Sequence, residues 1–532
     1  MTEPESQHGP TVGHNAGLAG WLGPEERSGV RLMELACLLL LVVLSDLTVY
    51  RGSGFAGYAA LLVVGPLLIG MGTARRSFGS AAGFVGALLA LAAARLVWCG
   101  SGLLVGCGAA LLFAFAMALA GRCPYVLETV VFASQTIRSG YEGLQLYGDR
   151  LRRRGDLPRP TAWLNLALPL AALVVFGSIF VFANPDLMTI FSARLEAALA
   201  AIRRWLTGFS AWEVVFWCAS LWISVGLLRP AAAPEDRDSA DDDAFIHADA
   251  PLYGPFRNTL LTVIALFAVY LVFEFRTLWF REFPKGFYYS GYAHQGAAWL
   301  TLALGLATLL LSLIFRGRIL ADPRLGSLKQ LAWLWSLENA LLAMTVYHRL
   351  AIYVGFNGMT RMRVVGLLGI TCVAVGFALV VWKIIQQKRF VWLLRRQLWT
   401  VAAAVYLYAI LPVDMLVHTY NVRRILSGDP APSVQISVHP ITPDGFLVLP
   451  PLLESDNAII REGVRALLAE QLDKSRERVQ DHRELGWTAF QLAERVLIDR
   501  LSESSLQLEA HDDKSQKRDA LEQFHKYSYQ WY

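Results

Sequence analysis

Long apolar runs alternate with short polar segments from residue 32 to residue 416. A helix needs ~20 predominantly apolar residues to cross the ~30 Å hydrocarbon core of a bilayer, and these runs have about that length. The pattern predicts eleven transmembrane spans, at about 32–49, 54–72, 79–98, 102–120, 162–183, 210–228, 258–277, 295–315, 328–348, 363–385 and 397–416. We therefore expect an all-α, multi-pass transmembrane helical bundle.

Polar segments divide this bundle into parts. The sequence predicts a polar cytoplasmic N-terminus (1–31), a first set of about six spans (32–229) and an acidic flexible linker (230–257). A second set of about five spans (258–416) and an extramembrane C-terminal tail (417–532) follow. Within the first set, 121–161 is too polar to span the bilayer. The amphipathic segment 185–207 is expected to lie along a membrane face.

The tail is predicted to be small and mostly helical. Segment 433–439 alternates apolar and polar residues as a half-buried strand does, and a turn at 442–445 leads to a returning strand at 446–449. Two later segments have helical periodicity, with apolar stripes formed by Ile459, Ile460, Val464, Leu467 and Leu468, and by Trp487, Phe490, Leu497 and Leu501. A hairpin and two helices bury little surface by themselves, so the tail should pack on the membrane part or on a partner.

Basic residues indicate the orientation of the chain. Lysine and arginine are concentrated in the segments that face the cytoplasm if the N-terminus does, including 150–154 and 383–396. An odd number of spans then places the tail outside, in the periplasm of a Gram-negative cell. We expect a multi-pass protein of the inner (plasma) membrane, with the lipid bilayer as its surroundings.

The composition supports a membrane protein and narrows its chemistry. The 532 residues are 55% hydrophobic and 17% charged, whereas soluble proteins carry about 25% charged residues. The six cysteines lack CxxC spacing, and the ten histidines lack the spacing of metal ligands. The motifs of P-loop NTPases, zinc proteases and serine hydrolases are absent. We therefore predict no metal, no cofactor and no enzymatic activity, and no nucleic-acid partner because the basic residues follow membrane topology.

Glu338 is the most informative residue of the apolar runs, because it lies near the middle of the ninth predicted span. A carboxylate at mid-bilayer costs about 2.5 kcal/mol or more on insertion scales, so it needs a partner, water or a proton. Thr345 and Arg349 lie within about 20° of Glu338 on the same helix face, and His348 is next to Arg349. The pattern fits a polar pathway or ligand pocket, and equally an interhelical network of hydrogen bonds and ion pairs that serves folding.

The seventh predicted span has a similar polar stripe. Tyr270, Glu274 and Arg281 share a helix face at spacings of four and seven. The segment that follows is rich in basic and aromatic residues that could bind an anionic headgroup or anchor helix ends at the membrane surface, namely Arg281, Lys285, Tyr292 and His294.

Three segments of the second half resemble one group of bacterial polytopic membrane proteins, catalogued only as a domain of unknown function. They are 337–353 with 358–363, 285–296 and 420–422. The resemblance covers about 160–450, and implies motif positions at Arg349, Tyr353, Gly358, Thr360 and Arg363. His294 stands where the group's pattern has arginine. The resemblance implies a polytopic architecture and no particular activity.

Two hypotheses from different classes follow. In the first, a non-enzymatic membrane protein binds or transports a small solute, ion or lipid headgroup through a polar bundle interior. Glu338, Arg349 and Glu274 would line the site, with His348 as a proton-sensitive neighbour. In the second, a scaffold or signalling protein acts through its tail, which would bind an envelope protein, and through its basic cytoplasmic loop. A membrane-embedded transferase would need paired acidic or histidine groups, and the sequence has no such pair with convincing spacing.

Overall fold

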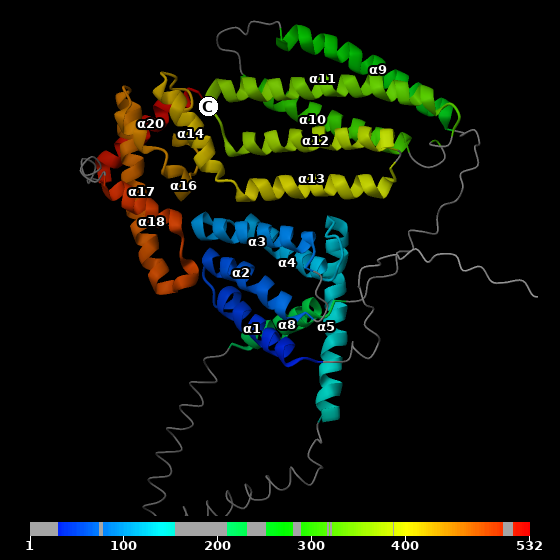
Figure 1. Cartoon of the computed structure of the whole chain (residues 1–532). Coiled ribbons are helices and arrows are strands. Elements are labelled where there is room, and N and C mark those ends of the chain that lie inside the picture. Colours follow the sequence, from blue (N-terminus) through cyan, green and yellow to red (C-terminus); the bar gives the residue numbers. More distant parts are fainter. Residues whose placement is uncertain are drawn as a thin grey trace, which may run out of the picture.

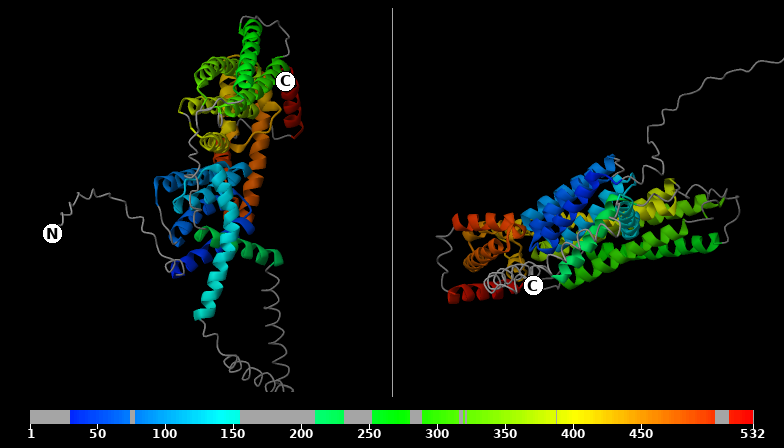
Figure 2. Two further views of the ribbon diagram at one scale, coloured as in Figure 1. Left: turned by 90° about the vertical axis from the view of Figure 1, so that its right-hand side faces the viewer. Right: turned by 90° about the horizontal axis from the view of Figure 1, so that it is seen from below.

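The computed structural model shows a helical protein in which two sets of long helices stack beside each other and a smaller helical tail covers one end of both (Figures 1 and 2). No β-strand occurs among the residues that the structure describes. These residues are 30–73, 78–154, 210–230, 252–279, 289–315, 319, 322–386, 388–503 and 514–531. The all-α, multi-pass fold class predicted from the sequence is confirmed.

The first helix set shares one hydrophobic core. It consists of α1 (Leu32–Ser45, continued by the π-helical turn η2, Asp46–Tyr50), α2 (Phe55–Gly72), α3 (Ser80–Cys99), α4 (Gly102–Leu119) and α8 (Ala211–Leu228). The polar helix α5 (Val126–Arg154) runs across the ends of these helices rather than alongside them (Figure 1). This direction agrees with its composition, because a helix this polar is stable at a membrane surface and costly inside the bilayer.

The second helix set has a core of its own and packs against the first through its last helix. It consists of α9 (Tyr253–Glu274, continued by η4, Phe275–Trp279), α10 (Tyr289–Ile314), α11 (Leu325–Asn357), α12 (Arg361–Gln386) and α13 (Phe390–Ile410). Ala409 of α13 belongs to the core of the first set, and the Tyr406 hydroxyl donates a hydrogen bond of 2.6 Å to the Leu88 carbonyl. Helix α13 therefore joins the two sets.

Seven of the described helices are long and apolar enough to cross a membrane, or eight if α13 and the next helix, α14 (Val413–Leu426), form one span bent by 67°. The predicted span 162–183 lies outside the described residues. The apolar part of α10, Ala298–Ile314, is shorter than the other spans. Helix α11 is long enough, but Glu338 and Asn339 lower its hydropathy. Helices α10 and α11, together with the eight, lie at ten of the eleven spans predicted from the sequence.

The tail folds into a compact helical unit around a third core. Its elements are α14, α15 (Ser433–Ser437), α16 (Pro443–Phe446), η6 (Pro450–Glu454), α17 (Ala458–Leu485), η7 (Trp487–Ala489), α18 (Leu492–Glu503) and α20 (Lys514–Tyr529). The two predicted amphipathic helices are present as α17 and α18. Their stripes turn inward at Ile460, Val464, Leu468, Leu497 and Leu501, which are all buried.

The predicted β-hairpin in the tail is wrong. Segment 433–439 begins with α15, and the expected turn at 442–445 begins α16, with Pro443 in its first turn. Alternation predicts a strand with one buried and one exposed face. Here residues 433–436 are all buried, and no strand lies beside them in the described chain. Gln435 donates instead to the Asn357 carbonyl at the end of α11 (2.9 Å).

The tail covers one end of the membrane helices, and α5 lies at the other. The Ser53 amide, just before α2, donates to the Thr488 hydroxyl (3.2 Å), and the Gly100 amide, just after α3, donates to the Gln491 side chain (2.7 Å). At the opposite end, Arg395 of α13 pairs with Glu128 of α5. The tail and α5 therefore lie at opposite ends of the helical bundle.

Candidate functional site

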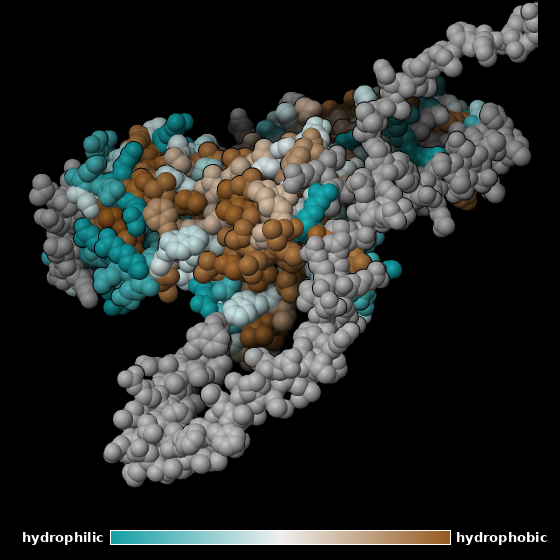
Figure 3. Space-filling model, turned by 60° about the horizontal axis from the view of Figure 1, so that its bottom comes forward, coloured by the Kyte–Doolittle hydropathy of each residue, from teal (hydrophilic) through white to brown (hydrophobic). Residues whose placement is uncertain are grey.

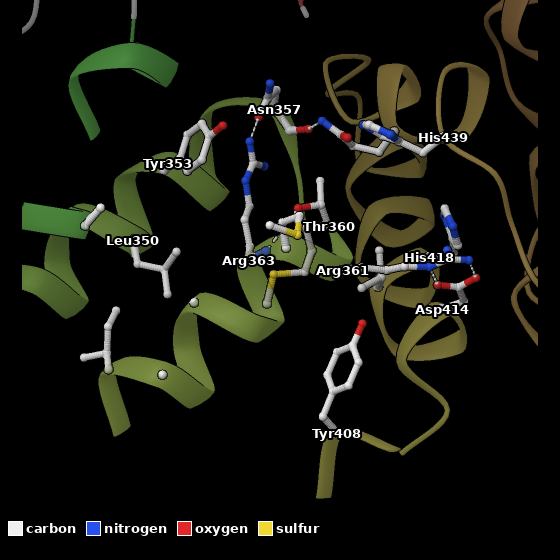
Figure 4. A pocket seen from close by; sticks show the side chains of 18 of the residues that line it. Leu350, Tyr353, Asn357, Thr360, Arg361, Arg363, Tyr408, Asp414, His418 and His439 are labelled. Atoms are coloured by element: carbon white, nitrogen blue, oxygen red, sulfur yellow. Dashed lines mark hydrogen bonds and ion pairs between the residues drawn. The ribbon is translucent and has the colours of Figure 1, made fainter. Parts of the chain in front are cut away.

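A cavity of about 820 Å³ lies where the second helix set meets the tail (Figure 4). Helices α10, α11, α12 and α13 form its membrane side, and α14, α15 and the segment after α15 form its tail side. The polar side chains that line it include Tyr353, Arg361, Arg363, Asp414, His418 and His439. The bend between α13 and α14 brings Asp414 and His418 over the start of α12, and His439 follows α15.

The turn between α11 and α12 positions the basic side chains of this cavity. Gly358 ends α11 with φ of 94°, a conformation that L side chains rarely adopt. Asn421 of α14 then binds both backbone polar groups of the next residue: its Oδ1 accepts from the Met359 amide (2.7 Å), and its Nδ2 donates to the Met359 carbonyl (2.9 Å). Helix α12 therefore starts at a fixed place relative to the tail.

Gly358→Ala should destabilise the protein by about 3 kcal/mol, because the backbone conformation is nearly restricted to glycine. In addition, the new Cβ would come within 2.5 Å of Asn421 Oδ1. Thermal unfolding in detergent measures the change. Gly355→Ala is the matched control, since a Cβ at Gly355 meets nothing within 4 Å and alanine favours the helix. Equal midpoints for the two variants would contradict this account of the turn.

Arg363 holds a buried positive charge beside the cavity. Its guanidinium lies over the Tyr353 ring, 3.8 Å from the centroid, and donates to the Gly358 carbonyl and the Asn357 side chain. In the described part of the chain no carboxylate lies within ion-pair distance of Arg363, and its Nε is buried without a hydrogen-bond partner. The charge is thus held by dipoles and an aromatic ring, which leaves it available to an anion.

Arg361 is paired, and its partner begins a chain of polar contacts. Asp414 receives both arms of the Arg361 guanidinium. Asp414 Oδ2 also accepts from the Thr442 amide and hydroxyl, each at 2.7 Å. Thr442 in turn bonds Asp444, which accepts from Arg95 Nη2 of α3 (2.8 Å). We call this set, Arg361–Asp414–Thr442–Asp444–Arg95, the junction network.

Two histidines complete the polar side of the cavity. His418 is buried next to Asp414, and its Nδ1 has no hydrogen-bond partner among the described residues (Figure 4). Partial burial and the nearby Arg361 and Arg363 charges lower the pKa of His439, which lies outside the membrane-spanning segments. His439 is therefore neutral near pH 7, and its imidazole can both donate and accept a hydrogen bond.

One part of the cavity is apolar. Leu350, Met362 and Ile370 line it, together with Gly366 and Gly369 of α12. A Cβ at either glycine would meet nothing within 4 Å. The cavity therefore combines a cationic, hydrogen-bonding end next to the tail with an apolar part along α12.

The residues singled out in the sequence fall into separate places. Tyr353, Thr360 and Arg363 line the cavity. Arg349 and Glu274 instead form a buried bidentate ion pair, with N–O distances of 2.6 and 2.8 Å. The Tyr270 hydroxyl also donates to Glu274 (2.9 Å), and His348 stacks on Trp279, 4.3 Å between ring centroids. This group is a satisfied interhelical network.

Glu338 stands apart from that ion pair. Its side chain is buried, and its Oε2 has no hydrogen-bond partner in the described structure. Two neighbouring buried polar atoms on α11, Trp335 Nε1 and Asn339 Oδ1, are also without partners there. Since an ionised carboxylate without a partner is costly in such a place, Glu338 is expected to be protonated.

The predicted interfacial residues cannot be placed in the site. Arg281 and Lys285 lie outside the described residues. Tyr292 and His294 belong to α10, but their side chains lie outside the described part of the chain.

Sequence reasoning missed Arg361, Asp414, His418 and His439 as members of one site. Asp414 lies near the end of the last predicted span, 397–416, and Arg361 lies inside the segment that carries the family resemblance. The signal that could have joined them is the Leu411-Pro412 step after α13, because proline restricts the preceding residue and breaks the helix. At that break the helix axis bends by 67°, which places α14 across the start of α12.

The fold and this cavity define a polytopic α-helical membrane protein with a polar junction between its membrane helices and its tail. A family model described as "Domain of unknown function (DUF4153)" matches residues 32–439. The chain belongs to this family. The match begins at the first span and includes the first helix set, so it reaches further toward the N-terminus than the resemblance at 160–450. No curated protein and no solved structure matches the chain.

Proposed function

We propose that this membrane protein binds an anionic solute or lipid headgroup in the cavity between α12 and the tail. The proposal keeps the solute- or headgroup-binding hypothesis from the sequence but moves the site from Glu338 and the Glu274–Arg349 pair to Arg361, Arg363 and His439. The protein is expected to act without catalysing a reaction.

One observation carries the proposal: the described residues that line the cavity include two arginines and one carboxylate. Arg361 is neutralised by Asp414, whereas Arg363 has no carboxylate within ion-pair distance among the described residues. A buried or half-buried cation gains from a bound anion, and guanidinium groups bind phosphate and carboxylate through directed hydrogen bonds. The apolar part of the cavity would accept an alkyl chain attached to that anion.

The arrangement of the chain supports the expected location. The basic residues of α13 and α5 lie at one end of the bundle, and the tail lies at the other. With the positive end in the cytoplasm, the cavity would open near the outer face of the inner (plasma) membrane, where a periplasmic or extracellular anion reaches it.

Thermal unfolding of the purified full-length protein with two probes tests the proposal. Inorganic phosphate represents a free anion, and a soluble short-chain phosphatidylglycerol represents a headgroup with alkyl chains. Either probe should raise the unfolding midpoint of the wild type, since a ligand that binds the folded state stabilises it. Arg363→Gln should abolish the rise, and a wild-type midpoint unmoved by both probes would refute the proposal.

Gly369→Leu distinguishes the two ligand sources, because leucine would fill the apolar part of the cavity. If a lipid binds, Gly369→Leu loses the response to phosphatidylglycerol and keeps the response to phosphate. If the site binds only the anionic group, Gly369→Leu keeps the wild-type response to both probes. Gly305→Leu on α10 is the control, since Gly305 also meets nothing within 4 Å and does not line the cavity.

The scaffold hypothesis is a second candidate, and the compact tail with its exposed charged helix faces favours it. Deleting the tail cannot discriminate between the two functions, because Gln435 and His439 belong to the cavity. Lys474→Glu on the exposed face of α17 discriminates. It should weaken capture of a defined envelope partner if the tail is a scaffold, and leave the phosphate response unchanged.

A further inference from the structure

A groove of about 670 Å³ runs between α2 and α3, and its lining shares no residue with the lining of the junction cavity. Alanine and valine line its walls: Ala56, Ala59, Ala60 and Val63 on α2, and Ala90, Ala93, Ala94 and Val97 on α3. Large apolar side chains beside it point outward: the exposed fraction is 47% for Val63, 62% for Leu67 and 53% for Leu91. The groove therefore opens on a hydrophobic surface of the kind that faces lipid, next to the hydrophilic tail (Figure 3).

The tail closes one end of this groove with two aromatic residues and a cation. Trp487, Phe490 and Arg495 line the groove, and the same three residues line a second cavity of about 210 Å³ within the tail. His482 and Arg483 of α17 contribute to that second cavity. The apolar groove and the basic cavity are therefore neighbours that share a wall.

The shared wall lies at the level of the membrane surface. The Gln491 side chain accepts from the Gly100 amide (2.7 Å) and donates to the Leu96 carbonyl (2.9 Å), so the start of α18 is fixed to the end of α3. Trp487, 60% exposed, is placed beside the first turn of α2. Tryptophan at the end of a membrane helix is characteristic of the headgroup level of the bilayer.

The basic cavity has an excess of positive charge. Arg495 lies 4.7 Å from the centroid of the Phe490 ring, and neither Arg483 nor Arg495 has a carboxylate within ion-pair distance in the described chain. The nearby carboxylate, Glu494, is paired with Arg478 (3.2 Å) and lies 3.3 Å from His482 Nδ1. Its negative charge is therefore already compensated.

We propose that an anionic phospholipid of the bilayer binds here, with an acyl chain in the α2–α3 groove and its phosphate on Arg483 and Arg495. The small side chains of the groove leave room for an acyl chain, and Trp487 and Phe490 would pack beside the glycerol. The two unpaired guanidinium groups can donate hydrogen bonds to the phosphate. A membrane lipid fits because the groove is open to the bilayer along its length, whereas a soluble anion would use the basic cavity and leave the groove empty. The site is independent of the junction cavity.

Native mass spectrometry of the full-length protein, released from nanodiscs of equal parts phosphatidylglycerol and phosphatidylcholine, tests this proposal. The wild type should retain phosphatidylglycerol preferentially. The double variant Arg483→Gln, Arg495→Gln should lose about tenfold or more of that preference, because each basic residue near an anionic leaflet contributes roughly a factor of five. Arg500→Gln, an exposed arginine on the same helix α18, should keep the preference.

A second pair of variants tests the groove. Ala94→Leu narrows it and should reduce retention of both lipids, whereas Ala87→Leu, exposed on the same helix outside the groove, should not. Circular dichroism and the unfolding midpoint check that the variants are folded. The proposal would be overturned if the wild type retained the two lipids equally, or if the double variant kept the preference for phosphatidylglycerol. Release of the lipid by inorganic phosphate alone would also overturn it, because the site would then bind an anion without an acyl chain.

Discussion

Glu274→Gln should destabilise the protein by about 3–5 kcal/mol, the cost of removing one partner from a buried ion pair. Arg349 would remain in the bundle, only 6% exposed at its side chain, without the carboxylate that now binds two of its nitrogens. The effect is measured as a lowered unfolding midpoint in detergent.

Glu338→Gln is the matched comparison and should change the stability by less than about 1 kcal/mol. Glu338 makes no ion pair among the described residues, and glutamine has the shape of the protonated acid expected there. If Glu338→Gln destabilised as strongly as Glu274→Gln, Glu338 would have to be ionised and paired, which contradicts the arrangement found on α11.

Asp414→Asn should weaken the junction between the second helix set and the tail, with a loss of about 2–3 kcal/mol. The neutral asparagine amide lacks the negative charge that binds Arg361. Its NH₂ group, itself a donor, would also face the hydrogen-bond donors that the carboxylate now accepts from. The Arg361 side chain is 39% exposed, so water recovers part of the loss.

Limited proteolysis separates a local effect of Asp414→Asn from global unfolding. Cleavage between α13 and α15 should become faster, while the first helix set stays protected. Glu462→Gln, which removes a half-exposed carboxylate next to Arg465 on α17, is the control and should leave both stability and cleavage nearly unchanged. Equal behaviour of the two variants would show that the junction network does not hold the tail.

Hydrophobic patterning predicted the membrane helices well because lipid imposes a length and a composition on each of them. The same argument identified Glu338 as a residue in need of compensation, and it placed Glu274 and Arg349 in polar stripes of two helices. It could not show that Glu274 and Arg349 pair with each other. The ion pair joins positions 75 residues apart on two helices. A periodic stripe shows which face of a helix is polar and leaves open which helix it meets.

The tail and the junction cavity were harder to predict for a different reason. Segment 433–439 has the alternation of a strand, but residues 433–436 are all buried, which removes the distinction between two faces, so tertiary packing overrides the local pattern. Asp414 and Arg361 are 53 residues apart and meet because the chain bends after α13. A short break of this kind moves a whole helix while changing little in the hydropathy profile.

The junction network has a mechanical consequence for any transport cycle. Arg95 belongs to the first helix set and Arg361 to the second, and both are tied to the same short piece of tail. Tyr406, bonded to the Leu88 carbonyl, and Arg395, paired with Glu128, add attachments at other depths. Rocking one half of the molecule against the other would break all of these bonds in a single step. Access to the cavity is therefore expected to depend on small motions of α14 and its neighbours, within a frame that stays closed.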